Sequence, residues 1–172
     1  HSEHSARAFR SVTEKKVIKV PLPVQVPDVN ACGLHEFCID DNCSVFFTSF
    51  DGASYISRKN PLAAIEAFQK AFPKYDKSVR FVIKVMNQQM CSLWRECLGR
   101  AALDDRIVIF DGVVDRDHYY AILKSVDAVI SMHRAEGFGR LMAEAMVCGI
   151  PVIASGYSGN MDYMTNDNSW IV

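Results

Sequence analysis

Short apolar runs alternate with helix-like segments from residue 43 to the end of the chain. The predicted strands are 45–50, 79–85, 107–110, 128–130, 151–154 and 170–172, and the predicted helices are 61–72, 88–100, 116–123 and 139–148. Asn60 and Asp115 are expected to cap the helices that follow them, and Gly149 to end the last helix with a positive φ. Strands this apolar are typically buried on both faces of a sheet, and intervening helices imply parallel pairing through crossovers. We therefore predict a doubly wound, mainly parallel α/β sheet with helices on both faces.

The first 30 residues have a different character from the remainder. Residues 1–13 fit a short helix and residues 17–20 a short strand. Prolines at 21, 23 and 27 favour an extended linker over regular structure. We predict a tail and proline-rich linker over 1–30, arriving from an N-terminal domain that the sequence does not include, and one domain over 31–172, cut short at its C-terminus.

The charge balance excludes several classes of function. The 172 residues carry 19 Lys and Arg against 20 Asp and Glu, a net charge of −1, and contain no basic run. This is not the electrostatic pattern of a nucleic-acid-binding protein. The apolar runs are also far shorter than the roughly 18 residues that a membrane span requires.

The six cysteines are predicted to be reduced thiols, because disulfide frameworks usually belong to shorter, loop-rich secreted chains. Cys32, Cys38 and Cys43, with His35 as a fourth ligand, are an alternative metal site. Their spacing contains no CxxC pair and no second ligand cluster, so we favour an ordinary structural role and predict no metal.

Ligands of such sheets bind beyond the carboxyl ends of the strands, here the loops at 51–60, 111–115, 131–139 and 155–160. No GxGxxG follows the first strand and no Walker loop is present, which argues against dinucleotide binding and ATP hydrolysis. In the third loop, Gly137 and Gly139 allow close approach of backbone, and the following helix directs its N-terminus into the same space. Glu136 and Glu144 flank this anion cradle and can accept hydrogen bonds from sugar hydroxyls, which indicates a sugar nucleotide.

The residues around this loop resemble the Glu-x7-Glu signature of the retaining GT-B glycosyltransferases of the group 1 family, over about residues 15–172. The matching segments are Glu136-Gly137-Phe138-Gly139, Glu144-Ala145-Met146, Gly149-Ile150-Pro151-Val152-Ile153-Ala154, Arg58-Lys59-Asn60-Pro61, Phe110-Asp111-Gly112 and Gly156-Tyr157-Ser158-Gly159-Asn160. The resemblance is to the carboxy-terminal, donor-binding domain, a Rossmann-like half of the GT-B fold.

The resemblance implies a role for each matching residue. Glu136 would lie at the donor sugar as the catalytic carboxylate, and Glu144 would bind the ribose hydroxyls. The backbone at Phe138 and Gly139 would hold the diphosphate together with Lys59. The family's diphosphate arginine is expected near residue 54, where this chain has Ser54, and Arg58 is the candidate replacement.

The remaining candidates come from neighbouring segments of the same resemblance. Phe110 and Gly112 would lie beside the nucleobase. The last matching segment adds Gly159 and Asn160 to the donor-binding residues. His133 and Arg134 are equally consistent with ligand contact and with ordinary loop polarity.

The resemblance implies that the parent enzyme transfers a sugar, UDP- or GDP-linked, to a hydroxyl acceptor with retention of configuration. It implies no cofactor and no metal. The acceptor, a glycan or lipid-linked sugar, would be bound by the absent N-terminal domain in the cytoplasm, with peripheral membrane association through that domain. A sugar-nucleotide epimerase of the same architecture and a non-catalytic nucleotide-sugar binding module are the alternatives.

Overall fold

A computed structural model describes residues 1–40 and 42–172 and contains a six-stranded sheet in the order β3-β2-β1-β4-β5-β6. Every neighbouring pair of strands is parallel. The strands are β1 (Ser44–Asp51), β2 (Val79–Met86), β3 (Ile107–Asp111), β4 (Ala128–Ser131), β5 (Val152–Ala154) and β6 (Trp170–Ile171). The predicted doubly wound, Rossmann-like fold class is confirmed.

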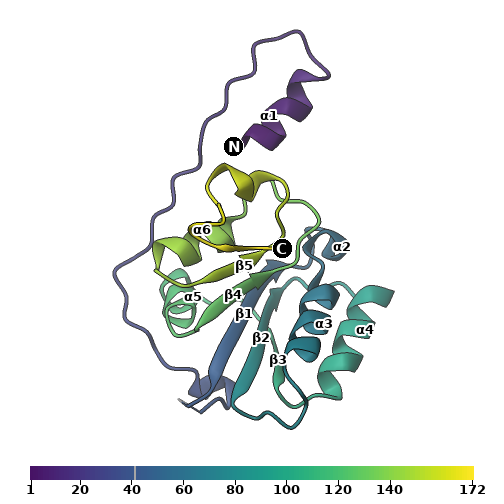
Figure 1. Cartoon of the computed structure of the whole chain (residues 1–172), viewed down its shortest axis with the longest axis vertical. Helices are drawn as coiled ribbons and strands as arrows, with labels where there is room; N and C mark the ends of the chain where they lie inside the picture. The colour runs from purple at the N-terminus through teal and green to yellow at the C-terminus, as the bar shows by residue number, and fades with distance from the viewer. Residues whose placement is uncertain (41) are drawn as a thin grey trace.

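Helices cover both faces of the sheet, with α3 and α4 on one side and α5 and α6 on the other (Figure 1). The α-helices are α1 (Glu3–Arg10), α2 (Ile56–Lys59), α3 (Pro61–Ala71), α4 (Ser92–Ala102), α5 (Arg116–Leu123) and α6 (Arg140–Val147), and the 3-10 helices are η1 (His35–Phe37) and η2 (Gly159–Asp162). The predicted cap Asp115 accepts a hydrogen bond from the His118 N–H, as expected for the start of α5.

Two hydrophobic cores result from this layering. Phe68 of α3 and Trp94 of α4 pack on Phe81 and neighbouring side chains of the sheet. Ile122 of α5 and Met142 of α6 belong to the second core, on the opposite face. Because both faces are buried, the strands require the nearly continuous apolar runs seen in the sequence.

Two local predictions differ from the structure. Residues 17–20 form no strand, and Ile18 and Val20 remain exposed, because this segment pairs with no edge of the sheet. The segment 51–60, expected to be a loop, contains the single-turn helix α2. Arg58 and Lys59 therefore lie in the last turn of a helix and not in a loop.

The N-terminal segment follows the α5 side of the domain to reach β1 (Figure 1). Arg116 of α5 and Lys124, directly after α5, donate hydrogen bonds to the carbonyls of Gln25 and Val29, respectively, at 2.8 Å each. At the opposite end of the segment, the N-terminus of α1 lies at η2, where the N–H of Glu3 donates to Asp162. The predicted tail thus contacts the domain near both of its ends, while Ile18 and Val20 between them remain exposed.

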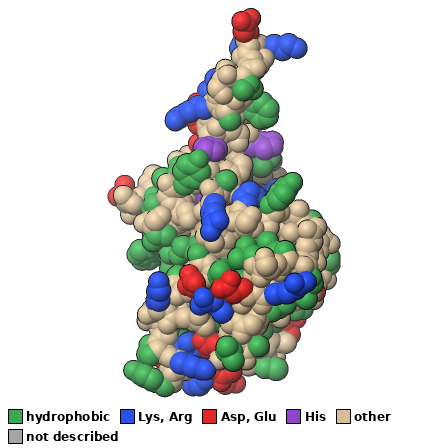
Figure 2. Space-filling view, turned by 90° about the vertical axis from the view of Figure 1, so that its right-hand side faces the viewer, with side chains coloured by type: hydrophobic (Ala, Val, Ile, Leu, Met, Phe, Trp, Pro, Cys, Tyr) green, Lys and Arg blue, Asp and Glu red, His purple; other side chains and the backbone are tan. Residues whose placement is uncertain are grey.

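The surface over α3 and α4 carries acidic and basic side chains side by side, as Figure 2 shows. On it, Arg100 of α4 lies 3.0 Å from Glu66 of α3 and 3.4 Å from Glu96. Exposed pairs of this kind contribute little to stability. Among the described residues, no helix has the length and apolar character needed to cross a membrane.

A buried ion pair joins the end of α3 to the start of β3. The guanidinium of Arg106, 1% exposed, lies 2.8 Å from Asp104 and also donates to the carbonyls of Phe72 and Pro73. It lies over the ring of Phe68 at 5.1 Å. Because Arg106 bonds both Asp104 and the two carbonyls that follow α3, the ion pair fixes how α3 ends against the sheet.

We expect Asp104→Ala to lower the free energy of unfolding by about 3–5 kcal/mol, because Arg106 would then be a buried charge without a counterion. Urea denaturation measures the change. Asp105→Ala is the matched control, since Asp105 is exposed and pairs with the exposed Lys77, so its loss should cost at most about 1 kcal/mol. Equal effects of the two variants would contradict the structural role of the buried pair.

The same pair predicts an acid-sensitive stability. Hydrogen bonds from Arg106 lower the pKa of Asp104 from 3.8 to about 2. The carboxylate therefore contributes stability that is complete above the unfolded value near 4 and is lost as pH falls toward 2. Between pH 4 and pH 2 the stability of wild type should fall more steeply than that of Asp104→Ala, as followed by urea denaturation at each pH. Parallel curves would contradict this.

Candidate functional site

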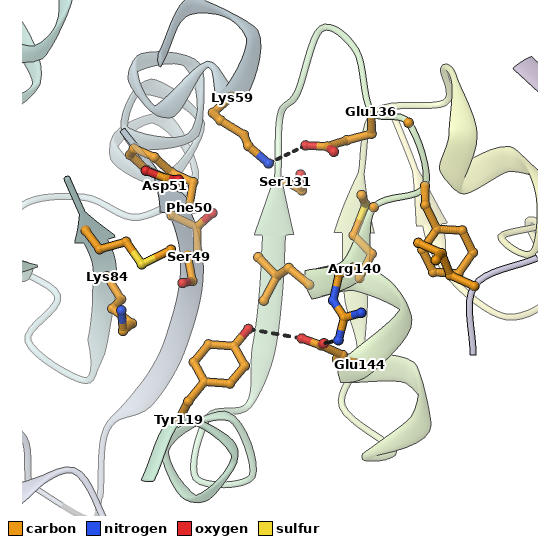
Figure 3. A pocket seen from close by; sticks show the side chains of 18 of the residues that line it. Ser49, Phe50, Asp51, Lys59, Lys84, Tyr119, Ser131, Glu136, Arg140 and Glu144 are labelled. Carbon is orange, nitrogen blue, oxygen red and sulfur yellow. Dashed lines mark hydrogen bonds and ion pairs between the residues drawn. The ribbon is translucent and has the colours of Figure 1, made fainter. Parts of the chain in front are cut away.

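A cavity of about 660 Å³ opens at the carboxyl ends of the strands. It is bounded by the ends of β1, β2 and β4, the loop after β3 and the N-terminal end of α6 (Figure 3). Residues that line it include Thr48, Ser49, Phe50, Asp51, Lys59, Lys84, Val113, Tyr119, Ser131, Glu136, Phe138, Gly139, Arg140 and Glu144. The volume is in the range of pockets that bind small molecules.

Glu136 lies at one end of the cavity between two cations. Its Oε1 is 2.6 Å from Lys59 Nζ and 3.1 Å from a terminal nitrogen of Arg58, and its side chain is only 12% exposed. Figure 3 shows Lys59 and Glu136 directed toward each other across the opening. The carboxylate therefore neutralises cations that the sequence assigned to a diphosphate.

The helix α2 directs these cations. Asn60 ends α2 with a left-handed backbone (φ 54°), a conformation that Asn tolerates, and α3 begins at the next residue. The sequence predicted that the Asn60 side chain caps α3. Instead its amide donates to the carbonyl of Met132 at 2.8 Å, which ties α2 to the loop after β4. The N–H of Arg134 also donates to the Arg58 carbonyl.

The first turn of α6 faces the cavity beside a second carboxylate. Glu144 is 5% exposed and accepts a hydrogen bond of 2.7 Å from Arg140 and one of 3.4 Å from the Tyr119 hydroxyl. Burial and the charge of Glu144 raise the pKa of Tyr119, so this phenol remains a hydrogen-bond donor. Because the first N–H groups of a helix have no partner within the helix, this end of α6 favours an anion.

Two loops touch backbone to backbone at the edge of the cavity. The N–H of Gly159 donates to the Glu136 carbonyl at 2.9 Å, and the Glu136 N–H donates to the Ser158 hydroxyl at 2.7 Å. A Cβ atom on Gly159 would lie 2.3 Å from the Gly137 carbonyl oxygen. Only glycine allows this approach, and it fixes the backbone from which the Glu136 side chain projects.

Five of the twelve predicted site residues line the cavity. They are Lys59, Glu136, Phe138, Gly139 and Glu144. Arg58 and Gly159 contact the lining residue Glu136, and the Gly112 carbonyl accepts a hydrogen bond from the lining residue Lys84.

The other four predicted residues do not line the cavity, although His133 lies 3.0 Å from the hydroxyl oxygen of the lining residue Ser131. His133 and Asn160 are buried and lie within hydrogen-bond distance of each other, at 3.1 Å. His133 also reaches the Tyr157 carbonyl, and Phe110 packs edge-on against Phe37. Arg134 is exposed outside the lining. These contacts place His133, Asn160 and Phe110 in the packing that supports the cavity.

Lys84 and Tyr119 line the cavity and were missed as site residues. A signal for Lys84 was present, because a lysine within an apolar strand that is buried on both faces needs a reason to be there. Tyr119 had none, since an aromatic residue at helical spacing is ordinarily a core residue.

All six cysteines are free, and Cys32, Cys38 and Cys43, the alternative metal site that the sequence offered, do not assemble as a ligand set. Over residues 1–40 and 42–172, the one group with metal-ligand chemistry is Cys32, Glu36 and His118, whose ligand atoms lie within 4.8 Å of one another. His118 Nε2 is 2.8 Å from Glu36. The group is separate from the residues that line the cavity.

We expect Gly159→Ala to lower the free energy of unfolding by about 1–3 kcal/mol, because the new Cβ forces the two loops apart. Gly99→Ala is the matched control: a Cβ there meets nothing within 4 Å, and Ala in the interior of α4 should stabilise by up to about 1 kcal/mol. Thermal and urea denaturation measure both. A neutral Gly159→Ala variant would show that the loop contact is dispensable.

Solved structures show which folds this chain is similar to. It matches Anabaena Alr3699/HepE in complex with UDP-glucose (TM-score 0.63, 21% identity, 76% of this chain and 35% of that one). It also matches TarM (TM-score 0.68, 15% identity, 99% of this chain and 32% of that one). A third match is an E. coli structure described as trehalose-6-phosphate bound with UDP-2-fluoro glucose (TM-score 0.63, 13% identity, 76% of this chain and 33% of that one). The chain spans about a third of the length of these structures. At such identities the likeness concerns the fold.

Comparison with curated proteins found no match. The family model described as glycosyl transferases group 1 matches residues 50–172, which is more than half of the chain and includes the carboxyl ends of all six strands. The match contains both Glu136 and Glu144, the residues on which the resemblance in the sequence rested. The chain therefore belongs to the group 1 glycosyl transferases.

Proposed function

We propose that this domain binds a nucleoside diphosphate sugar, UDP- or GDP-linked, in the cavity at the carboxyl edge of the sheet. The observation that carries the proposal is the juxtaposition of the α6 N-terminus and Lys59 with two carboxylates, Glu136 and Glu144. A helix N-terminus and a cation suit phosphates, and carboxylates suit sugar hydroxyls. The family match and the UDP-glucose in the HepE structure support the same ligand class.

The roles of the residues in this proposal are those that the resemblance to the family implies. Glu144 binds the ribose hydroxyls, and the diphosphate lies at the backbone of Phe138 and Gly139. Lys59 and Arg58 turn from Glu136 to the phosphates when the donor enters, which frees this carboxylate to face the donor sugar. As the glycosidic bond breaks, negative charge grows on the diphosphate, and the cations and the helix N-terminus stabilise it.

The complete enzyme, in this proposal, is a hexosyltransferase-type enzyme that transfers the sugar to a hydroxyl acceptor with retention, without a metal or cofactor. A separate N-terminal domain, cytoplasmic or peripheral at the membrane, binds a glycan or lipid-linked acceptor. The short coverage of the matched structures supports a second domain. This domain alone is then inactive in transfer, and the anomeric configuration of the product made by the complete enzyme tests retention.

Calorimetric titration with UDP, GDP and ADP tests donor binding. We expect one nucleotide to bind, and Glu144→Ala and Lys59→Ala each to weaken it by about 10-fold or more, because each removes a charged hydrogen-bonding partner. Glu66→Ala is the control, since this exposed carboxylate pairs with Arg100 on the helical face. Absence of binding by every nucleotide, or equal affinity in Glu144→Ala and wild type, would contradict the proposed site.

A further inference from the structure

Lys84 is a buried cation with unused hydrogen-bonding capacity in the wall of the cavity. Its side chain is 5% exposed and lies within β2. Its ammonium donates one hydrogen bond, of 3.0 Å, to the Gly112 carbonyl, and over the described residues it has no second hydrogen-bond acceptor. A lysine ammonium has three N–H donors and accepts none.

The surroundings of Lys84 are poor in charge. Burial lowers the pKa of Lys84, and the negative charge of Asp111 opposes that shift without a hydrogen bond between the two groups. A buried ammonium with unmade hydrogen bonds is costly, so a structural role alone does not account for a lysine here. The remaining donors need an acceptor from the ligand.

The position of Lys84 separates it from the cations at the diphosphate. In Figure 3 it lies beside Ser49 of β1, away from the pair formed by Lys59 and Glu136. It is paired in register with Ser49 of β1 and Phe110 of β3. Its one partner, Gly112, is in the segment at which the nucleobase is expected. The inference therefore rests on the proposed function, in which this cavity holds a nucleotide.

We propose that Lys84 donates a hydrogen bond to an exocyclic carbonyl of the nucleobase and so selects keto bases over amino bases. Uracil and guanine carry this carbonyl at the position where cytosine and adenine carry an amino group. Lysine can only donate, and an amino group at that position is also a donor. The Lys84 ammonium and the amino group of the base would then both lack an acceptor in a buried site. Buried polar groups left unpaired are the strongest source of discrimination between similar ligands.

Titration with matched nucleotide pairs tests this. UDP and CDP have the same ribose and diphosphate and differ only in the base. Uracil has the carbonyl O4 and a proton on the neighbouring ring nitrogen, where cytosine has an amino group and no proton on that nitrogen. GDP and ADP provide a second pair. The variant is Lys84→Met, which keeps the length of the side chain and removes its donors, with its folding checked by thermal denaturation. Arg80→Met is the control, because Arg80 lies at the opposite end of β2 and bonds the carbonyls of Lys77 and Val79.

We expect wild type and Arg80→Met to bind the keto member of a pair about 10-fold or more tightly than the amino member, the size expected for a hydrogen bond to a charged group. In Lys84→Met the two members should bind within about 3-fold of each other, through loss of affinity for the keto member. An unchanged ratio in Lys84→Met, or an equal loss for both members, overturns the inference while the nucleotide site stands. No binding of any nucleotide to wild type overturns the proposed function and this inference together.

Should Lys84→Met prove unfolded, Lys84→Gln provides the second variant. Its amide offers a donor and an acceptor, so it can pair with either type of base. The ratio of keto to amino affinity should again fall to within about 3-fold of unity. Retention of the wild-type ratio in a folded Lys84→Gln variant overturns the inference.

Discussion

Parallel pairing of all six strands is the constraint on which the remainder of the structure depends. Each strand must start from the same edge, so the chain returns through a crossover after every strand and the loops at the carboxyl edge collect in one place. Both faces of the sheet need covering, which the two hydrophobic cores provide. The cavity is a result of this arrangement, since it occupies the edge where the ends of β1, β2 and β4 meet.

The electrostatics of the cavity divide into three regions. Lys59 and Arg58 share Glu136 at one end, and Glu144 is held by Arg140 and Tyr119 beside the start of α6. In both regions each carboxylate already has a cation. Lys84 is different, because its partner is a neutral carbonyl. The three regions correspond in the proposed complex to diphosphate and sugar, ribose, and base.

Much of the fold was predictable from the sequence, because strand and helix periods are local properties. The six strands and four long helices follow the apolar pattern, and Asp115 and Gly149 behave as the helix-end residues they were predicted to be. Contacts between distant segments were not predictable in this way. The side chain of Asn60 was expected to cap its own helix and instead bonds the loop after β4. Likewise, the burial of His133 against Asn160 depends on how two loops pack.

The pairing of Glu136 with Lys59 and Arg58 means that the cavity carries its own counterion. In the proposed complex a phosphate does not meet bare cations, because it would have to displace a carboxylate attached to the same protein. Binding then exchanges one anion for another. The net gain in binding free energy is smaller than the attraction between phosphate and cation alone, and it depends less on salt concentration. A simple anion such as inorganic phosphate gains little from this exchange. A ligand with a sugar hydroxyl would also give the released carboxylate a new hydrogen-bond partner. It would thereby recover the binding free energy that is lost when Glu136 leaves its cations.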